Sequence, residues 1–202
     1  MVGIYISGHP LDDYKTEIDY FCNGNTSVLH DLKNIEGREV AIGGIISSVE
    51  HRVAKNGNGW AAFTLDDYEG SYEFRIFSEE YLKFKHFLVP NSFVYIKLIG
   101  RKNYYNDDIR ISFNSIQLLH DILDKYSKKI SIKIKIEEIN ETKISEMHKL
   151  IENFKGTKIL NFVILDAKEK LALNMPSRSL KVNISTAFLE ELKKQEINFK
   201  LN

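Results

Sequence analysis

The residues of this sequence that could do chemistry are aromatic and cationic side chains in and around two neighbouring segments of alternating polarity. Trp60 opens one segment and Arg75 lies in the next, and the expected burial of their apolar neighbours leaves both side chains facing outward. Flanking loops supply the rest of a candidate binding set, which comprises Lys55, Trp60, Arg75, Arg101, Lys102 and Tyr104. Aromatic rings can stack on bases and cations can hold phosphates, so this set predicts a surface for single-stranded nucleic acid.

Acidic residues beside this set argue against phosphate binding. Glu73 is expected on the same outer face as Arg75, and Asp107 and Asp108 lie in the later loop. The pattern is also that of a solvated face with ordinary surface aromatics, or of a surface that binds a protein or a sugar. Pattern alone leaves these interpretations open.

Residues for catalysis do not occur in the combinations that known chemistries use. The sequence holds no phosphate-binding glycine loop, no nucleophile elbow and no paired-histidine zinc motif, and its six histidines are scattered. The acidic pairs, such as Asp66 and Asp67, are better explained as turn residues or helix starts than as ligands of two metal ions. We therefore expect no catalytic residue, no metal site and no cofactor in this chain.

The composition is that of a folded protein without a strong overall electric field. Lys and Arg number 28, as do Asp and Glu, and 43% of the 202 residues are hydrophobic. A polycation of the histone kind is thereby excluded and a packed core is expected. The single cysteine, Cys22, allows no intramolecular disulfide and no cysteine-based zinc site, which favours a reducing, cytoplasmic compartment. No apolar stretch approaches the length of a membrane span, so no membrane partner is expected.

The middle of the chain is rich in strands. Alternating runs at 38–53, 60–65, 71–77, 92–102 and 109–119 predict five strands, and a helical pattern at 78–88 falls between the third and the fourth. The order strand, strand, strand, helix, strand, strand is that of the five-stranded OB-fold barrel. The glycine pair at 43–44 suggests a bulge or a sharp bend in the first strand.

Two further segments flank this one. Residues 1–35 predict short helices, and residues 121–202 predict a compact mixture of strands and two amphipathic helices that holds 16 basic and 12 acidic residues. The expected fold class is therefore mostly β plus α+β. A short helical linker at 1–35 precedes a five-stranded OB-fold barrel at 36–120, and a small α+β domain at 121–202 follows it.

Four stretches of sequence carry a resemblance to a known family. Residues 3–14 read GIYISGHPLDDY, and further blocks read VAIGGII at 40–46, AFTLDD at 62–67 and EFRIFSEEY at 73–81. In this order and spacing they resemble the alpha subunit of bacterial DNA polymerase III. The resemblance is clear over residues 3 to about 120 and weaker beyond, where the stretch Met175-Pro176-Ser177 is similar to the family's C-terminal domain.

The resemblance implies the C-terminal region of a replicative DNA-directed DNA polymerase, a nucleotidyltransferase. The family's catalytic aspartates lie in an upstream palm domain, so this chain should be inactive alone, with magnesium used by the parent polymerase. The resemblance also implies an OB domain that contacts single-stranded template DNA. It implies a C-terminal domain that docks the tau subunit of the clamp loader, with other replisome subunits as further partners. Residues 36–120 hold 10 basic and 11 acidic residues, so we expect weak binding to single-stranded DNA.

Two other classes of protein stay open at this point. One is a nucleic-acid-binding OB module of another system, such as the anticodon-binding barrel of a tRNA synthetase or a helicase wedge domain. The other is a protein-interaction module, in which the barrel is a spacer and the third segment binds a partner, with no polymerase role. An enzyme that acts alone is disfavoured by the lack of catalytic motifs.

Overall fold

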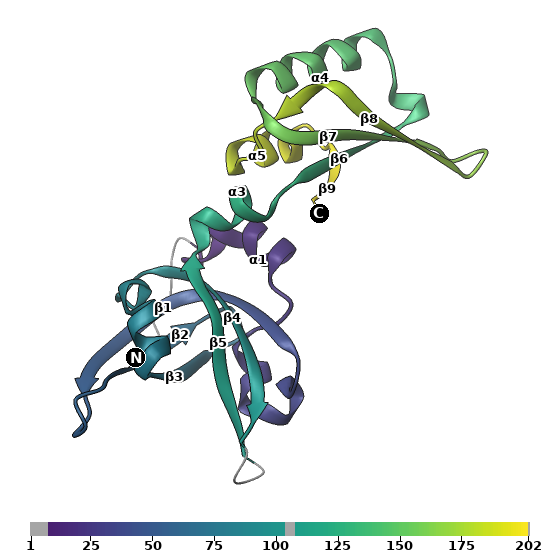
Figure 1. Cartoon of the computed structure of the whole chain (residues 1–202). Helices are drawn as coiled ribbons and strands as arrows, with labels where there is room; N and C mark the ends of the chain where they lie inside the picture. Colours follow the sequence, from purple (N-terminus) through teal and green to yellow (C-terminus); the bar gives the residue numbers. More distant parts are fainter. Residues whose placement is uncertain (1–7, 104–107, 202) are drawn as a thin grey trace. The chain divides into compact units, whose positions relative to one another are not determined.

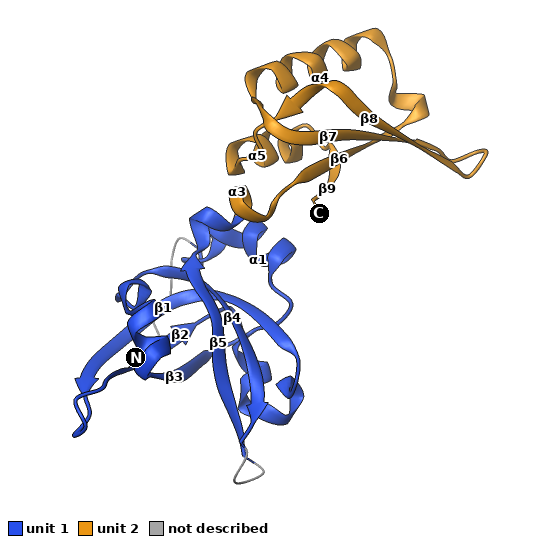
Figure 2. Cartoon of the chain, in the orientation of Figure 1, with its two compact units in different colours: residues 1–122 blue, residues 123–202 orange. Residues whose placement is uncertain are grey.

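The structure is a computed structural model that describes residues 8–103 and 108–201 (Figure 1). The chain divides into two compact units, residues 1–122 and residues 123–202 (Figure 2). No helix in the described part of the chain is long and apolar enough to cross a bilayer. The sequence-based division into parts at 1–35, 36–120 and 121–202 stays a prediction.

The first unit is built on one antiparallel sheet of five strands in the order β3-β2-β1-β4-β5. The strands are β1 (Glu39–Val53), β2 (Gly59–Asp66), β3 (Ser71–Phe77), β4 (Phe93–Lys102) and β5 (Ile109–Leu118), and helix α2 (Ser78–Phe84) with the 3₁₀ turn η4 (Lys85–Phe87) joins β3 to β4. The predicted element order and the fold class of mostly strands in an OB-type sheet are confirmed. Phe63, Phe74 and Phe113 pack at the centre of its core, with ring centroids 5.1–6.1 Å apart.

The expected closed barrel is not formed. In the described residues no ladder joins β3 to β5, so both are edge strands of the sheet. The carboxylate of Glu80, on α2, accepts hydrogen bonds from the Ser112 hydroxyl at 2.7 Å and from the Phe113 backbone N–H at 3.1 Å. The Glu80 side chain thus makes hydrogen bonds at the edge of β5, where a strand that closed the barrel would make its own.

The glycine pair in β1 serves close packing, and the bulge, one of the two features that the pair suggested, lies elsewhere in the strand. The register of β1 against β2 shifts between Ile46 and Ser48, which places the bulge further along the strand. A Cβ atom added to Gly43 would lie 2.9 Å from Ile18, and one added to Gly44 would lie 2.7 Å from the Asp66 carbonyl oxygen. Only glycine lets these neighbours approach the strand so closely.

The described part of the N-terminal segment packs on this sheet. It contains η1 (Asp12–Tyr14), α1 (Lys15–Phe21), η2 (Thr26–His30) and η3 (Leu32–Ile35). Leu11, Leu29 and Ile35 are fully buried, and the Tyr95 hydroxyl of β4 donates to the Phe21 carbonyl at 3.0 Å. Burial also raises the pKa of the Cys22 thiol to about 12, with the nearby Asp67 charge adding to the effect, so the thiol stays protonated at neutral pH.

The second unit is a four-stranded mixed sheet in the order β8-β7-β6-β9. Its strands are β6 (Lys129–Lys135), β7 (Lys155–Asp166), β8 (Leu171–Val182) and β9 (Asn198–Leu201), with η5 (Leu119–Asp121) and α3 (Ile122–Tyr126) in the preceding connection and η6 (Ile136–Glu138) after β6. Helix α4 (Glu141–Asn153) makes the crossover between the parallel strands β6 and β7, and all other pairs are antiparallel. The α+β prediction is confirmed, and β8 is one irregular strand whose register against β7 shifts.

The helices of the second unit begin where their sequences provide caps. The Asn140 side chain accepts from the Lys143 backbone N–H at 2.8 Å at the start of α4, and Ser185 caps α5 (Thr186–Lys194) through the Phe188 N–H at 3.3 Å. Rings of Phe154 and Phe188 lie 5.2 Å apart in the shared core. Capping and apolar spacing together fix both helices on the sheet.

A buried carboxylate ties the N-terminal segment to the hairpin between β2 and β3. Asp67 accepts from the Thr26 backbone N–H at 2.5 Å and the Thr26 hydroxyl at 2.8 Å. The same carboxylate accepts from the backbone N–H groups of Glu69 and Gly70 at 2.8 and 3.1 Å. Asp67 is thus a turn residue, as the sequence indicated, and it orders two segments that are distant in the chain.

Replacing Asp67 by Ala should lower the free energy of unfolding by about 2–4 kcal/mol, because it leaves the fully buried Thr26 without its acceptors. Urea denaturation followed by circular dichroism measures this. Glu69→Ala, an exposed change in the same turn, is the control and should cost less than about 0.5 kcal/mol. Equal losses in both variants would contradict the anchoring role.

Candidate nucleic-acid interface

The predicted outer face of β2 and β3 is formed as the alternation required. Ala61, Phe63 and Leu65 are buried, whereas Trp60 and Thr64 on the same strand are half-exposed. On β3 the buried residues are Phe74 and Ile76, and the outward residues are Glu73, Arg75 and Phe77. Trp60 and Arg75 therefore share the solvent face of neighbouring strands, and their binding of a ligand there stays a prediction.

Three side chains form a row across the outer face. Arg52 of β1 lies opposite Trp60 of β2, and Trp60 lies opposite Phe77 of β3. The Arg52 guanidinium carbon is 5.4 Å from the Trp60 ring centroid, and the Trp60 and Phe77 rings are stacked at 5.7 Å with planes 22° apart. Phe77 is 53% exposed. The row offers a continuous aromatic platform with a cation at one end.

Phe77 is absent from the set that the sequence indicated. The signal was present, because Phe77 follows Glu73 and Arg75 at the same two-residue period. Phe77 was nevertheless left out of the set, because a large apolar side chain in a strand is expected in the core. Arg52, also outside that set, lies near the end of β1.

A glycine and a tyrosine fix the strand end that carries Trp60. A Cβ atom added to Gly59 would lie 2.5 Å from the Tyr81 ring of α2, so the backbone at this point packs directly against that ring. The Tyr81 hydroxyl lies 3.2 Å from Nδ1 of His51, whose Nε2 lies 3.3 Å from the Leu88 carbonyl oxygen. This network holds the ends of β1 and β2 in place beneath the aromatic row.

The cations of the outer face carry their own counter-ions. Arg75 pairs with Glu73 at 3.2 Å, and Arg52 pairs with Glu50 at 2.6 Å. All four side chains are exposed, so solvent and salt screen both pairs. The face is therefore close to neutral, and its attraction for phosphate depends on how readily the arginines leave their partners.

A groove of about 740 Å³ lies between the edges of β3 and β5, where the barrel is open. Arg75 and Phe77 line one side and Arg110 lines the other. Arg101 lies opposite Arg110 in the register of β4 and β5, and Lys102 follows it. The structure thus groups Arg75 with Arg110, whereas Arg101 and Lys102 are not among the residues that line the groove.

Two residues of the predicted set remain, Lys55 and Tyr104. Lys55 is exposed in a tight turn in which the Ala54 N–H donates to the Asn58 carbonyl at 2.8 Å and Gly57 has φ +81°. Tyr104 lies outside the residues that the structure describes. Within the described ranges, no group of three or more His, Cys, Asp or Glu side chains is placed to hold a metal ion.

Fold and surface together define an OB-type domain with an aromatic outer face, followed by a separate α+β domain. Residues 40–119 match the family model of the OB-fold nucleic acid binding domain, and residues 130–202 match the model of the C-terminal domain of the DNA polymerase III alpha subunit. The chain is thus related over most of its length to bacterial DNA polymerase III alpha subunits, and the resemblance found in its sequence blocks is confirmed.

Individual relatives agree with these matches. DNA polymerase III subunit alpha of Borreliella burgdorferi is 29% identical over 89% of this chain and 14% of its own length. The same protein of Buchnera aphidicola from Acyrthosiphon pisum is 25% identical over 96% of the chain and 16% of its own length. The chain therefore spans about one seventh of the length of these curated relatives.

Among solved structures, one example is similar at a low level. It is the second OB-fold domain of replication protein A from Methanococcus maripaludis, with a TM-score of 0.27 and 16% identity over 41% of this chain and 85% of that one. The assignment of the OB-type sheet is based on the strand order and the family match and does not depend on this likeness.

Glu73→Gln should strengthen binding of a short labelled oligothymidylate roughly two- to fivefold at low salt, because it releases Arg75 from its partner and removes a negative charge from the face. Fluorescence anisotropy measures the affinity. Glu69→Gln removes a charge from the exposed hairpin turn and is the matched control. No gain for Glu73→Gln, or the same gain for Glu69→Gln, would contradict a role for the Arg75 side of the face.

Proposed function

We propose that the first unit binds single-stranded template DNA through the outer face of β2 and β3. The observation that carries this proposal is the row of Arg52, Trp60 and Phe77, in which a half-exposed and an exposed ring lie side by side on two strands. Each base stacked on an aromatic side chain is worth roughly 1–3 kcal/mol without regard to sequence. The family match to OB-fold nucleic acid binding domains supports this assignment.

Binding is proposed to be weak. The two arginines of the face are paired with carboxylates, and the chain has no net charge to attract DNA from a distance. Stacking must therefore supply most of the affinity, with Tyr104 proposed as a further stacking side chain. Phosphate contacts from Lys55, Arg75, Arg101 and Lys102 are proposed to add to it. Arg110, across the groove from Arg75, extends the same cationic border.

The chain is proposed to serve as the C-terminal region of a replicative DNA-directed DNA polymerase. Its relatives are polymerase III alpha subunits, and its second unit matches the C-terminal domain of that family. We assign to the second unit the docking of the clamp-loader tau subunit, with other replisome subunits as further partners. Nucleotidyl transfer with magnesium is assigned to the parent polymerase and not to this chain.

Trp60→Ala and Phe77→Ala should each weaken binding of oligothymidylate about tenfold, because each removes one stacking surface. Arg75→Ala should instead flatten the salt dependence, by about 0.7 in the slope of log K against log salt for each lost phosphate contact. Anisotropy over a series of salt concentrations separates the two effects.

Leu82→Ala is the matched control, because Leu82 is an exposed apolar residue on α2 that is not part of the aromatic row. It should leave the affinity unchanged. Equal affinities for wild type, Trp60→Ala and Phe77→Ala would show that the aromatic row does not bind DNA. Absence of binding by the wild type at high micromolar concentration would show that the first unit is a structural spacer.

A further inference from the structure

The sheet of the second unit leaves part of its apolar face without a cover. Cross-strand pairing puts Phe162 with Met175 and Ile164 with Leu173 on one side of β7 and β8. Ile134 of β6 pairs with Ile164 and continues this side toward the buried core at Ile132. Helix α4 covers the part nearest the core, and the side chains beyond it face solvent.

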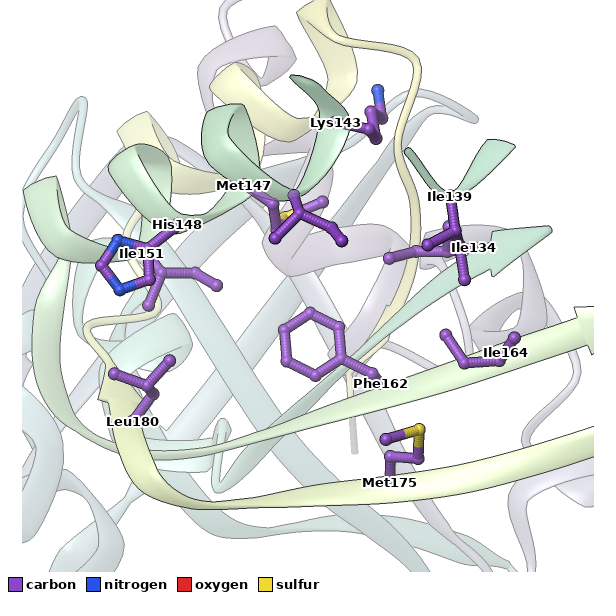
Figure 3. A pocket seen from close by; sticks show the side chains of 11 residues that line it. Ile134, Ile139, Lys143, Met147, His148, Ile151, Phe162, Ile164, Met175 and Leu180 are labelled. Atoms are coloured by element: carbon purple, nitrogen blue, oxygen red, sulfur yellow. The ribbon is translucent and has the colours of Figure 1, made fainter. Parts of the chain in front are cut away.

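A groove runs between α4 and this part of the sheet (Figure 3). Its volume is about 320 Å³. Figure 3 shows Met147 and Ile151 pointing down from α4 and Phe162 and Met175 lying opposite them on the strands. Nearly every side chain that lines it is apolar; the polar exceptions among the described residues are Lys143 and His148.

The apolar surface continues out of the groove along the edge strand β8. Leu171, Leu173 and Met175 alternate on the same side of that strand and are 65%, 61% and 49% exposed. Ile144 adds a further exposed apolar side chain from α4. Such a contiguous patch is costly on a free surface and marks a site of association.

The geometry favours a helix as the occupant. The floor of the groove is made of side chains on a sheet face, which offers no backbone donors or acceptors to an extended peptide. An occupant must therefore satisfy its own backbone hydrogen bonds, as an α-helix does. A helix there would lie beside α4 and complete the helical layer over this sheet.

The positive charge of Lys143 in the groove favours a partner helix that carries an acidic residue. Lys143, the charged side chain that lines the groove, has no carboxylate within ion-pair distance among the described residues. His148 faces Glu152 at 3.8 Å. A partner with an acidic residue beside its apolar stripe would pair with Lys143.

We infer that this groove binds an amphipathic helix of a protein partner. The partner's apolar residues at i, i+3, i+4 and i+7 would pack against β8 and α4, and an acidic residue of the partner would lie beside Lys143. The inference rests on the proposed docking role of the second unit and names the surface that performs it. The cognate tau C-terminal region is the probe, used with the full 202-residue chain.

Calorimetry should show binding to the wild type at micromolar concentration and a loss of at least tenfold for Met175→Asp, because the change puts a charge into an apolar contact. Leu173→Asp, at a more exposed position, should give a similar loss. Lys143→Glu should weaken binding about threefold or more and remove part of its salt dependence. Circular dichroism checks that each variant is folded.

Ile159→Asp is the matched control, because Ile159 is also apolar and 49% exposed and alternates with the buried Leu160, on the other side of β7. Its affinity should stay within twofold of wild type. Equal binding by wild type, Met175→Asp and Leu173→Asp would show that the groove is not the binding site and would leave the docking role of the second unit in place. No binding by the wild type would overturn both. A wild-type dimer that Met175→Asp converts to a monomer would show that a second copy occupies the groove, which also overturns the inference.

Discussion

The packing of Phe63 against Phe74 inside the first unit is the constraint on which its outer surface depends. The two rings lie 5.1 Å apart on neighbouring strands, and both are almost fully buried. Because side chains alternate along a strand, fixing these two inward fixes Trp60, Arg75 and Phe77 outward. A shift of one residue in register would bury the platform and expose the core. The stability of the fold and the geometry of the candidate interface therefore share one cause.

The barrel of the first unit stays open at one seam, whereas the order of its elements predicted a closed one. The strand order leaves β3 and β5 at the edges, and Glu80 occupies the hydrogen-bonding positions of Ser112 and Phe113. The resulting gap forms a groove whose borders carry Arg75 and Arg110. In the second unit an apolar groove arises for a related reason, since α4 leaves part of the long strands β7 and β8 uncovered. Both units thus present surfaces that the sheet itself does not complete.

Much of the fold follows from periodicity in the sequence. The alternation at 60–65 and 71–77 predicted which side chains of β2 and β3 are buried, and the helical spacing predicted two amphipathic helices where α4 and α5 form. Features that depend on distant contacts could not be read in this way. The close approach of Ile18 to Gly43, the bond from Thr26 to Asp67 and the register of Arg52 against Trp60 join segments that only the folded chain brings together. Phe77 could have been found from the two-residue period alone.

The central claim is that DNA contacts the aromatic row, and the chain offers a direct probe because Trp60 is its only tryptophan. Titration of the full chain with unlabelled oligothymidylate should change the Trp60 emission saturably, with a midpoint equal to that of anisotropy. Phe77→Ala should weaken both signals together, since Phe77 stacks on Trp60. Binding detected by anisotropy with no change in Trp60 emission would contradict the claim and place the DNA elsewhere on the chain.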